Sequence, residues 1–289
     1  MGTVYAAQHP RLPRMVALKV LNVPVSADPS FRLRFQREGQ LAASLEHPHI
    51  VPIYDCGDDR GQLWLSMRLV RGTTAAAQVA ITPQGMPVEP VLDIVRAVAS
   101  ALDFANRRGV VHRDVKPANI LLTSRTASAA DALLSDFGIA QFLDDARPLA
   151  RNGRVRGSIA YAAPELLQAQ RLSPSTDLYA LACSLIEWLT GKPPYPRQTA
   201  FAITYAHIRD PVPPLTGRRP WLPSSLNSVF AKALAKDPGH RYETCEEFVS
   251  IIARTLRDVT SPEPPRPARR FGWFPKRDTD EGTRAEGRR

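Results

Sequence analysis

The chain has 289 residues, of which 44% are hydrophobic and 23% charged, and its formal net charge is +10. This composition indicates a globular, soluble chain with room for one large domain or two lobes. It excludes a transmembrane segment, because no run of about eighteen apolar residues is present, and no signal peptide is expected. Three cysteines without pairing or ligand spacing exclude a disulfide framework and favour a reducing, cytoplasmic location; they are Cys56, Cys183 and Cys245.

The positive net charge could indicate an anionic partner such as nucleic acid. The arginines, however, are spread along the whole chain, and no helix-turn-helix or zinc-finger pattern is present. We therefore expect no nucleic-acid partner. A basic balance also suits a site that handles phosphate.

The first part of the chain predicts strands and one helix. Residues 15–21 (MVALKVL) and 62–70 (QLWLSMRLV) are short apolar runs typical of strands. Between them, residues 30–47 have helical spacing, and Pro48 is expected to end that helix. The candidate inward-facing positions are Phe31, Phe35, Leu41 and Leu45.

From about Pro90 the pattern becomes helical. Residues 90–109 predict an amphipathic helix that ends at a glycine, and residues 175–191 predict a buried central helix that is apolar nearly all round. Residues 224–242 and 245–256 supply further helix. We expect an α+β fold with a small β-rich lobe, residues 1–70, and a larger helical lobe, residues 71–258.

The last segment, residues 259–289, is rich in proline and in mixed charge, with too little apolar surface to offset the entropy of ordering. We expect a disordered tail. Its basic first half could make a peripheral contact with an anionic membrane surface, although a solvated tail is the favoured interpretation.

Polar residues capable of phosphate chemistry lie in two short segments. Residues 110–122 (VVHRDVKPANILL) place Asp114 two residues before Lys116 and five before Asn119. On a loop, this order can bring a base, a cation and a metal-binding amide around one phosphate. Residues 133–140 (LLSDFGIA) place Asp136 after an apolar strand, where its carboxylate could hold Mg²⁺.

Together with VALK upstream and AAPELL at residues 162–167, these segments follow the order of a known motif set. Over residues 1–257 the chain resembles the protein kinase family, and within it the bacterial Ser/Thr kinases of actinobacterial type. The resemblance implies a two-lobed kinase fold that uses ATP and Mg²⁺ to phosphorylate protein hydroxyls.

The resemblance also implies roles for individual residues. Lys19 would hold the α- and β-phosphates, and Glu38 would pair with it, unless Glu38 is only an exposed acid. Asn119 and Asp136 would hold Mg²⁺. The catalytic pair would be Asp114, which accepts the proton of the substrate hydroxyl, and Lys116, which steadies the phosphoryl group.

Other matching residues are expected to form the scaffold of the site. His112 and Arg113 would support the catalytic segment, and Asp177 would tie that segment to the central helix. Glu165 would form a buried structural ion pair with Arg241.

The resemblance places the adenine between the lobes, with Met67 behind it and the backbone near Leu69 and Val70 beside its edge. An ordinary core role stays open for the three apolar walls, which would be Val4, Ala17 and Leu122.

Residues 2–5 (GTVY) match the last glycine of the family's glycine-rich loop and the strand that follows it. The first strand and the first two glycines have no counterpart. A start codon assigned too late and a truly shortened chain are both open, and we favour the first. Because that loop donates N–H groups to the phosphates, we expect weak or no activity from the chain as printed, and a sheet edge prone to self-association.

Residues 139–156 contain no serine or threonine. We therefore hypothesise that phosphorylation of this loop does not switch the protein. Asp144 or Asp145 could supply a standing negative charge near Arg113, although exposed loop acids are the favoured interpretation. Ser158 aligns with a threonine that faces the substrate and Asp114 in the family.

We interpret the chain as a protein Ser/Thr kinase. A catalytically impaired pseudokinase or docking module is the alternative from a different class. A small-molecule kinase is a weaker alternative, because the GSIAYAAPE segment is typical of protein kinases.

Overall fold

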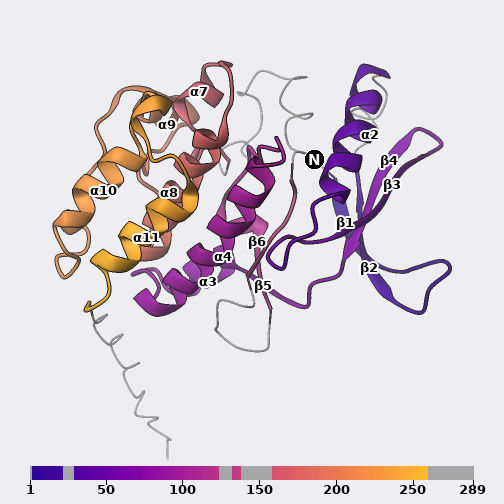
Figure 1. The fold of residues 1–289 in the computed structure, drawn as a ribbon, viewed down its shortest axis with the longest axis horizontal. Helices are drawn as coiled ribbons and strands as arrows, with labels where there is room; N and C mark the ends of the chain where they lie inside the picture. The colour runs from indigo at the N-terminus through magenta and orange to yellow at the C-terminus, as the bar shows by residue number, and fades with distance from the viewer. Residues whose placement is uncertain (1, 22–28, 124–131, 138–157, 260–289) are drawn as a thin grey trace, which may run out of the picture.

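The computed structural model describes residues 2–21, 29–123, 132–137 and 158–259. The described chain has a β-rich part with one helix, followed in sequence by a predominantly helical part (Figure 1). This arrangement confirms the predicted α+β, two-lobed fold. The predicted tail and the loop acids Asp144 and Asp145 lie outside the described residues.

The first lobe is built on an antiparallel sheet with the strand order β1-β2-β4-β3. Its inner face is apolar because alternate residues of β4 point inward, and Leu63 and Leu65 are fully buried. The register places Val4 of β1 opposite Lys19 of β2, and Ala17 opposite Met67 of β4. The strands are β1 Thr3–Gln8, β2 Met15–Val20, β3 Ile53–Asp59 and β4 Gln62–Arg68.

Helix α2, Pro29–Ala43, covers this sheet beside β3 (Figure 1). The predicted inward positions Phe35 and Leu45 are buried, which confirms them, whereas Leu41 is 45% exposed, so the prediction was wrong for Leu41. The side chain of the fourth predicted position, Phe31, lies outside the described part of the structure. A helix turns by about 100° per residue, which puts positions four and seven residues after Phe35 on its face. Those positions are Gly39 and Ala42, and both are buried.

A second antiparallel sheet, β5-β6-β7, begins the other lobe. The Val51 N–H donates to the Leu134 carbonyl of β7 at 2.9 Å, and the Leu134 N–H donates to His49 at 2.8 Å. Backbone hydrogen bonds therefore join the two lobes next to the segment that carries Asp136. The strands are β5 Gly72–Thr74, β6 Ile120–Thr123 and β7 Ala132–Leu134.

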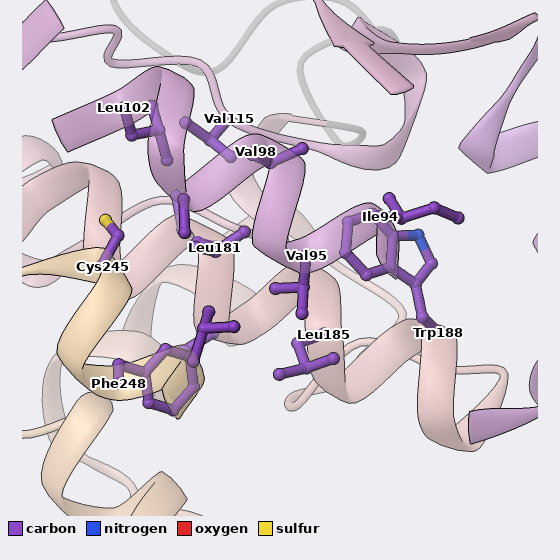
Figure 2. Close-up of a cluster of buried hydrophobic side chains, with 14 of the residues drawn as sticks. Ile94, Val95, Val98, Leu102, Val115, Leu181, Leu185, Trp188, Cys245 and Phe248 are labelled. Atoms are coloured by element: carbon purple, nitrogen blue, oxygen red, sulfur yellow. The ribbon is translucent and has the colours of Figure 1, made fainter. Parts of the chain in front are cut away.

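The helical lobe packs around α8, Pro174–Thr190, whose side chains are buried on nearly every face. Leu181 and Trp188 of α8 share one buried cluster with Phe248 of α11 and with Ile94 of α4, and Figure 2 shows Trp188 beside Ile94. This confirms the predicted central helix, which ends at Gly191 with φ of 76°. The neighbouring helices are α3 Ala75–Ile81, α4 Val88–Asn106, α7 Pro164–Leu167, α9 Ala200–Arg209, α10 Ser225–Ala233 and α11 Cys245–Thr255.

The helix predicted over residues 224–242 is shorter than expected. Helix α10 ends at Ala233, and a separate 3₁₀ turn, η4, spans Pro238–His240. The Asp237 side chain accepts the Gly239 N–H at 2.8 Å, and proline cannot continue a helix from the preceding turn. Of the described helices, none has the length and apolar character needed to cross a bilayer.

A buried ion pair joins α7 to the segment before α11. The Arg241 guanidinium donates to both Glu165 oxygens, at 2.7 and 2.8 Å. Burial opposes ionisation of Glu165, but the hydrogen bonds and charge of Arg241 outweigh it and hold the pKa of Glu165 below its usual range. The predicted structural ion pair is therefore present.

We expect Glu165→Gln to lower the free energy of unfolding by about 3–5 kcal/mol, because it leaves the Arg241 charge buried without its counter-ion. Urea unfolding followed by circular dichroism measures this effect. Asp93→Asn is the matched control, since Asp93 pairs with Arg96 at 3.1 Å on the surface and should contribute about 0.5 kcal/mol. Equal losses in the two variants would contradict the assignment.

Candidate active site

The 110–122 segment is held to the central helix by one carboxylate. Asp177 of α8 accepts the backbone N–H of His112 on one oxygen and that of Arg113 on the other, each at 2.8 Å. Arg113 has a φ of 70°, in the left-handed region that non-glycine residues rarely adopt. Because Asp177 is 1% exposed, the packing of the core sets its position. Its two hydrogen bonds then fix the backbone of this turn.

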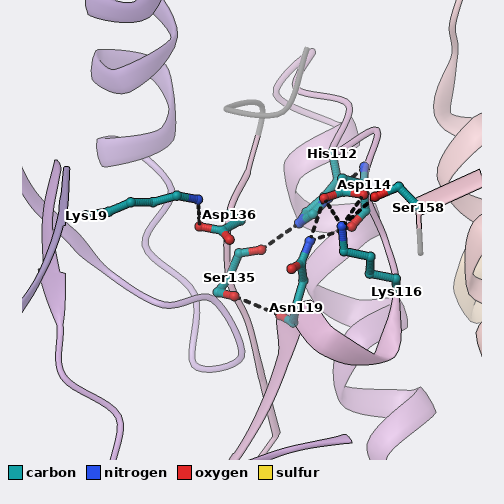
Figure 3. A network of polar contacts seen from close by, with 8 residues as sticks. All are labelled: Lys19, His112, Asp114, Lys116, Asn119, Ser135, Asp136 and Ser158. Carbon is teal, nitrogen blue, oxygen red and sulfur yellow. Dashed lines mark hydrogen bonds and ion pairs between the residues drawn. The ribbon is translucent and has the colours of Figure 1, made fainter. Parts of the chain in front are cut away.

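The turn brings three of the predicted residues together (Figure 3). The Lys116 ammonium donates to both oxygens of Asp114, at 2.8 and 2.6 Å. The Asn119 amide nitrogen also donates to Asp114, to its backbone oxygen at 2.8 Å and to its carboxylate at 2.9 Å. A carboxylate that accepts three hydrogen bonds, two from an ammonium and one from an amide, is held in one orientation.

Ser158 reaches this cluster from a distant part of the chain. Its hydroxyl accepts a hydrogen bond from Lys116 at 2.8 Å. Lys116 thus bridges Ser158 and Asp114, which are 44 positions apart in the sequence. The segment that begins at Ser158 therefore lies beside the carboxylate.

Asp136 is placed by its neighbour Ser135. The Ser135 N–H and hydroxyl both donate to the Asn119 carbonyl at 2.9 Å, and the Ser135 carbonyl lies 2.9 Å from Nε2 of buried His112. Asp136 itself has a φ of 67°, which directs the chain sharply after β7. These bonds connect Asp136 with the 110–122 segment, and Figure 3 shows Lys19 reaching Asp136 from the opposite lobe.

Lys19 pairs with a different acid from the one predicted. Its ammonium donates to Asp136 at 2.7 Å, and within the described part of the chain Asp136 is the only acid at ion-pair distance. Glu38 of α2 lies 3.9 Å from the Arg113 guanidinium instead. The predicted Lys19–Glu38 pair is therefore wrong for this structure, because α2 directs Glu38 toward Arg113 while the 135–136 turn brings a carboxylate to Lys19.

The oxygen groups here fit a magnesium ion. Mg²⁺ prefers carboxylate and amide oxygens, and Asp136 and Asn119 supply one of each. Both hydrogen bonds of the Asn119 side chain are made by its nitrogen, so no described residue donates to its oxygen. Figure 3 shows that oxygen on the side of Ser135 and Asp136.

The predicted adenine-pocket residues fall into different surroundings. Ala17 and Met67 are buried in one small cluster, with Leu69 and Val70 packed against it. Leu122 of β6 packs instead against the large helical core. Val4 is 55% exposed on β1, so it is not an ordinary core residue.

Sequence reasoning missed several residues that shape the site. Ser135 was not singled out, although the SDFG spacing places it one residue before Asp136. Tyr161 was also missed: its hydroxyl donates to Glu187 of α8. Burial raises the pKa of Glu187, against the effect of the Tyr161 hydrogen bond. No local pattern in the sequence signals this second pair, since its members are 26 positions apart.

The chain is similar to known proteins over most of its length. Residues 1–251 match the family model described as "Protein kinase domain". The Serine/threonine-protein kinase PknF of Mycobacterium tuberculosis is 44% identical over 267 residues, which cover 92% of this chain and 56% of PknF. Serine/threonine-protein kinase PknJ of Mycobacterium bovis is 42% identical over 258 residues, covering 89% of this chain and 43% of PknJ.

The crystal structure of the Mycobacterium tuberculosis PknI kinase domain superposes with a TM-score of 0.72 at 40% identity. The match covers 89% of this chain and 91% of that domain. The chain thus spans about half the length of the curated relatives it matches, and nearly all of the solved domain.

We expect Asp177→Asn to loosen the 110–122 segment, because the new amide places an N–H donor against one of the two backbone donors. Hydrogen exchange should accelerate at the His112 and Arg113 amides and stay unchanged at the Leu234 amide of the helical core, which donates to Phe230. Unchanged exchange at His112 and Arg113 would contradict this role for Asp177.

Proposed function

This chain belongs to the protein kinase family, and on that premise we propose that it is a serine/threonine kinase that transfers the γ-phosphate of ATP to hydroxyls of protein substrates. The observation that carries the proposal is the cluster of Asp114, Lys116 and Ser158. It places an oriented carboxylate and a shared ammonium beside the segment at which a protein hydroxyl would have to arrive.

Asp114 is proposed to accept the proton of the substrate hydroxyl as that hydroxyl attacks phosphorus. Its carboxylate is 11% exposed and is held by Lys116 and Asn119, so it can be oriented before the substrate arrives. Lys116 is positioned to stabilise negative charge on the transferred phosphoryl group, since its ammonium lies 2.6 Å from Asp114. Positioning and charge stabilisation are the main requirements of phosphoryl transfer.

Asn119 and Asp136 are proposed to hold Mg²⁺, and Lys19 to bind the α- and β-phosphates of ATP. When bound, Mg²⁺ would neutralise charge on the phosphate oxygens. The pairing of Lys19 with Asp136 supports the proposal, because a cation from one lobe and a metal-binding carboxylate from the other already meet at 2.7 Å. Glu38 would support the site indirectly, because its carboxylate lies 3.9 Å from the Arg113 guanidinium next to Asp114.

The adenine is proposed to contact Ala17, Met67, Leu69 and Val70, which share one small apolar cluster at the junction of the lobes. Exposed Val4, opposite Lys19 in the sheet register, could cover the nucleotide from β1. Leu122 could contribute from β6, where its side chain is half-buried. Protein substrates, a cytoplasmic location and self-association through the sheet edge are part of the proposal, and a solvated tail is favoured over peripheral membrane contact.

One observation favours a second function, a pseudokinase that binds partners without catalysis. The Lys19–Asp136 pair engages the proposed phosphate-binding and metal-binding groups with each other. If this ion pair stays formed, Lys19 cannot bind the phosphates and Asp136 cannot bind the metal, so the chain would bind no Mg²⁺–ATP. Nucleotide binding therefore separates the two functions.

We expect Asp114→Asn to reduce phosphotransfer at least about a thousandfold, since general-base catalysis and substrate orientation are lost together. The transfer is measured as the label that moves from ATP, in the presence of Mg²⁺, to peptides containing serine, threonine or tyrosine. Asp93→Asn on the exposed face of α4 is the control and should retain activity. Transfer to tyrosine alone, or full activity of Asp114→Asn, would overturn the proposal.

We expect Mg²⁺–ATP to raise the melting temperature of the chain, and Lys19→Met to remove most of that rise. A thermal shift titration with ATP, with and without Mg²⁺, measures the effect. Lys192→Met on the exposed surface is the control. If the unmodified chain shows no ATP-dependent shift, the pseudokinase function is supported instead.

A further inference from the structure

The segment from Ser158 to Ala163 is held at three points, each by a side chain from a different element. Lys116 donates to the Ser158 hydroxyl at 2.8 Å, and Tyr161 donates to Glu187 of α8. The third anchor is His207 of α9, whose Nε2 lies 3.1 Å from the Ala160 carbonyl. Only the first of these touches the cluster around Asp114.

His207 is fully buried, and both of its ring nitrogens have partners. A carbonyl can only accept, so the bond to Ala160 requires a proton on Nε2. The Tyr179 hydroxyl of α8, 2.9 Å from Nδ1, then donates to the unprotonated nitrogen. The neutral imidazole with its proton on Nε2 therefore satisfies every polar atom in this contact.

The surroundings keep the imidazole uncharged. Burial, together with the nearby Lys236 ammonium, lowers the pKa of His207 to about 3, against the smaller raising effect of the hydrogen bond to the Ala160 carbonyl. Tyr195 packs edge-on against the ring, with centroids 4.9 Å apart. At neutral pH the ring is thus a fixed, neutral donor.

Lys236 fixes the helix that carries this ring. Its ammonium donates to the carbonyls of Ala206 and His207 at the end of α9, at 3.2 and 2.7 Å. The Ala206 carbonyl also accepts the Asp210 N–H at 3.0 Å, so Lys236 adds a second donor there and supplies one to the His207 carbonyl in the last turn of α9. Helix α9 also packs beside α7, the helix that directly follows the anchored segment in the sequence (Figure 1).

We infer that His207 is a positioning residue for the protein substrate. Through its hydrogen bond to the Ala160 carbonyl, it fixes the position of the 158–163 segment. The substrate residues next to the acceptor hydroxyl must lie against this segment. This inference rests on the proposed kinase function. His207 does not touch the reacting groups and acts through Ala160 and Ser158, which lies two residues earlier and bonds Lys116. The residues proposed to bind the nucleotide and its metal, Lys19, Asn119 and Asp136, make their hydrogen bonds to other groups than His207 and Ala160.

Two substitutions separate the donor to Ala160 from the packing of the ring. His207→Gln can place an amide N–H near the position of Nε2, whereas His207→Asn can meet Tyr179 but is too short to reach Ala160. We expect His207→Asn to raise the KM for a peptide substrate roughly tenfold, because the half-buried Ala160 carbonyl loses its donor. The KM for ATP should stay within about twofold of the unmodified value, and His207→Gln should recover most of the peptide KM.

Equal increases in the KM for ATP and for peptide would overturn the inference, as would an unchanged peptide KM in His207→Asn. Failure of His207→Gln to improve on His207→Asn would also overturn it, since a purely structural role does not depend on the donor. Melting temperatures of both variants, measured alongside, show whether each remains folded at the assay temperature.

Hydrogen exchange provides a readout that does not need activity. The Tyr161 and Ala162 amides donate within the anchored turn, to Ser158 and Ile159 at 3.2 Å. We expect both to exchange faster in His207→Asn, while the Leu234 amide of the core is unchanged. If the unmodified chain phosphorylates no peptide, the proposed function fails; the contact itself is then supported by faster exchange and overturned by unchanged exchange.

Discussion

The buried carboxylate of Asp177 is the contact on which the candidate site depends. It lies in the central helix α8, and its two oxygens accept the backbone N–H groups of His112 and Arg113 at 2.8 Å. Backbone in the left-handed region, such as Arg113, is held only where its surroundings determine it. The position of Asp114, the next residue, thus follows from the packing of a helix more than sixty positions later in the chain.

A second constraint is the meeting of the two lobes at Lys19 and Asp136. Each residue belongs to a separate packing unit: Lys19 to the four-stranded sheet, and Asp136 to the turn after β7. Backbone hydrogen bonds between residues 49–51 and Leu134 hold the lobes together beside this turn. The ion pair therefore depends on how the sheet and this turn are placed, while Glu38 of α2 lies 3.9 Å from the Arg113 guanidinium.

Much of the fold could be predicted from local patterns. The run of residues 175–191, apolar nearly all round, predicted α8, and the short apolar run of residues 62–70 predicted β4. The order of the short polar motifs indicated the family, and the Glu165–Arg241 and Asp177 contacts followed from that resemblance. The prediction for Leu41 was wrong because the buried face of α2 passes through Ala42, one residue later. The predicted helix stopped at Ala233 because Asp237 caps a separate turn that begins at Pro238.

The sequence by itself determined which groups are available and roughly which elements carry them, because periodicity and motif spacing are local properties. Only the tertiary structure decided which of these groups meet. Lys19 contacts Asp136 instead of Glu38, and His207 reaches Ala160 across 47 positions. Such pairings depend on how helices and turns pack in three dimensions, where a shift of a few ångströms exchanges one partner for another, and no short stretch of residues records that choice.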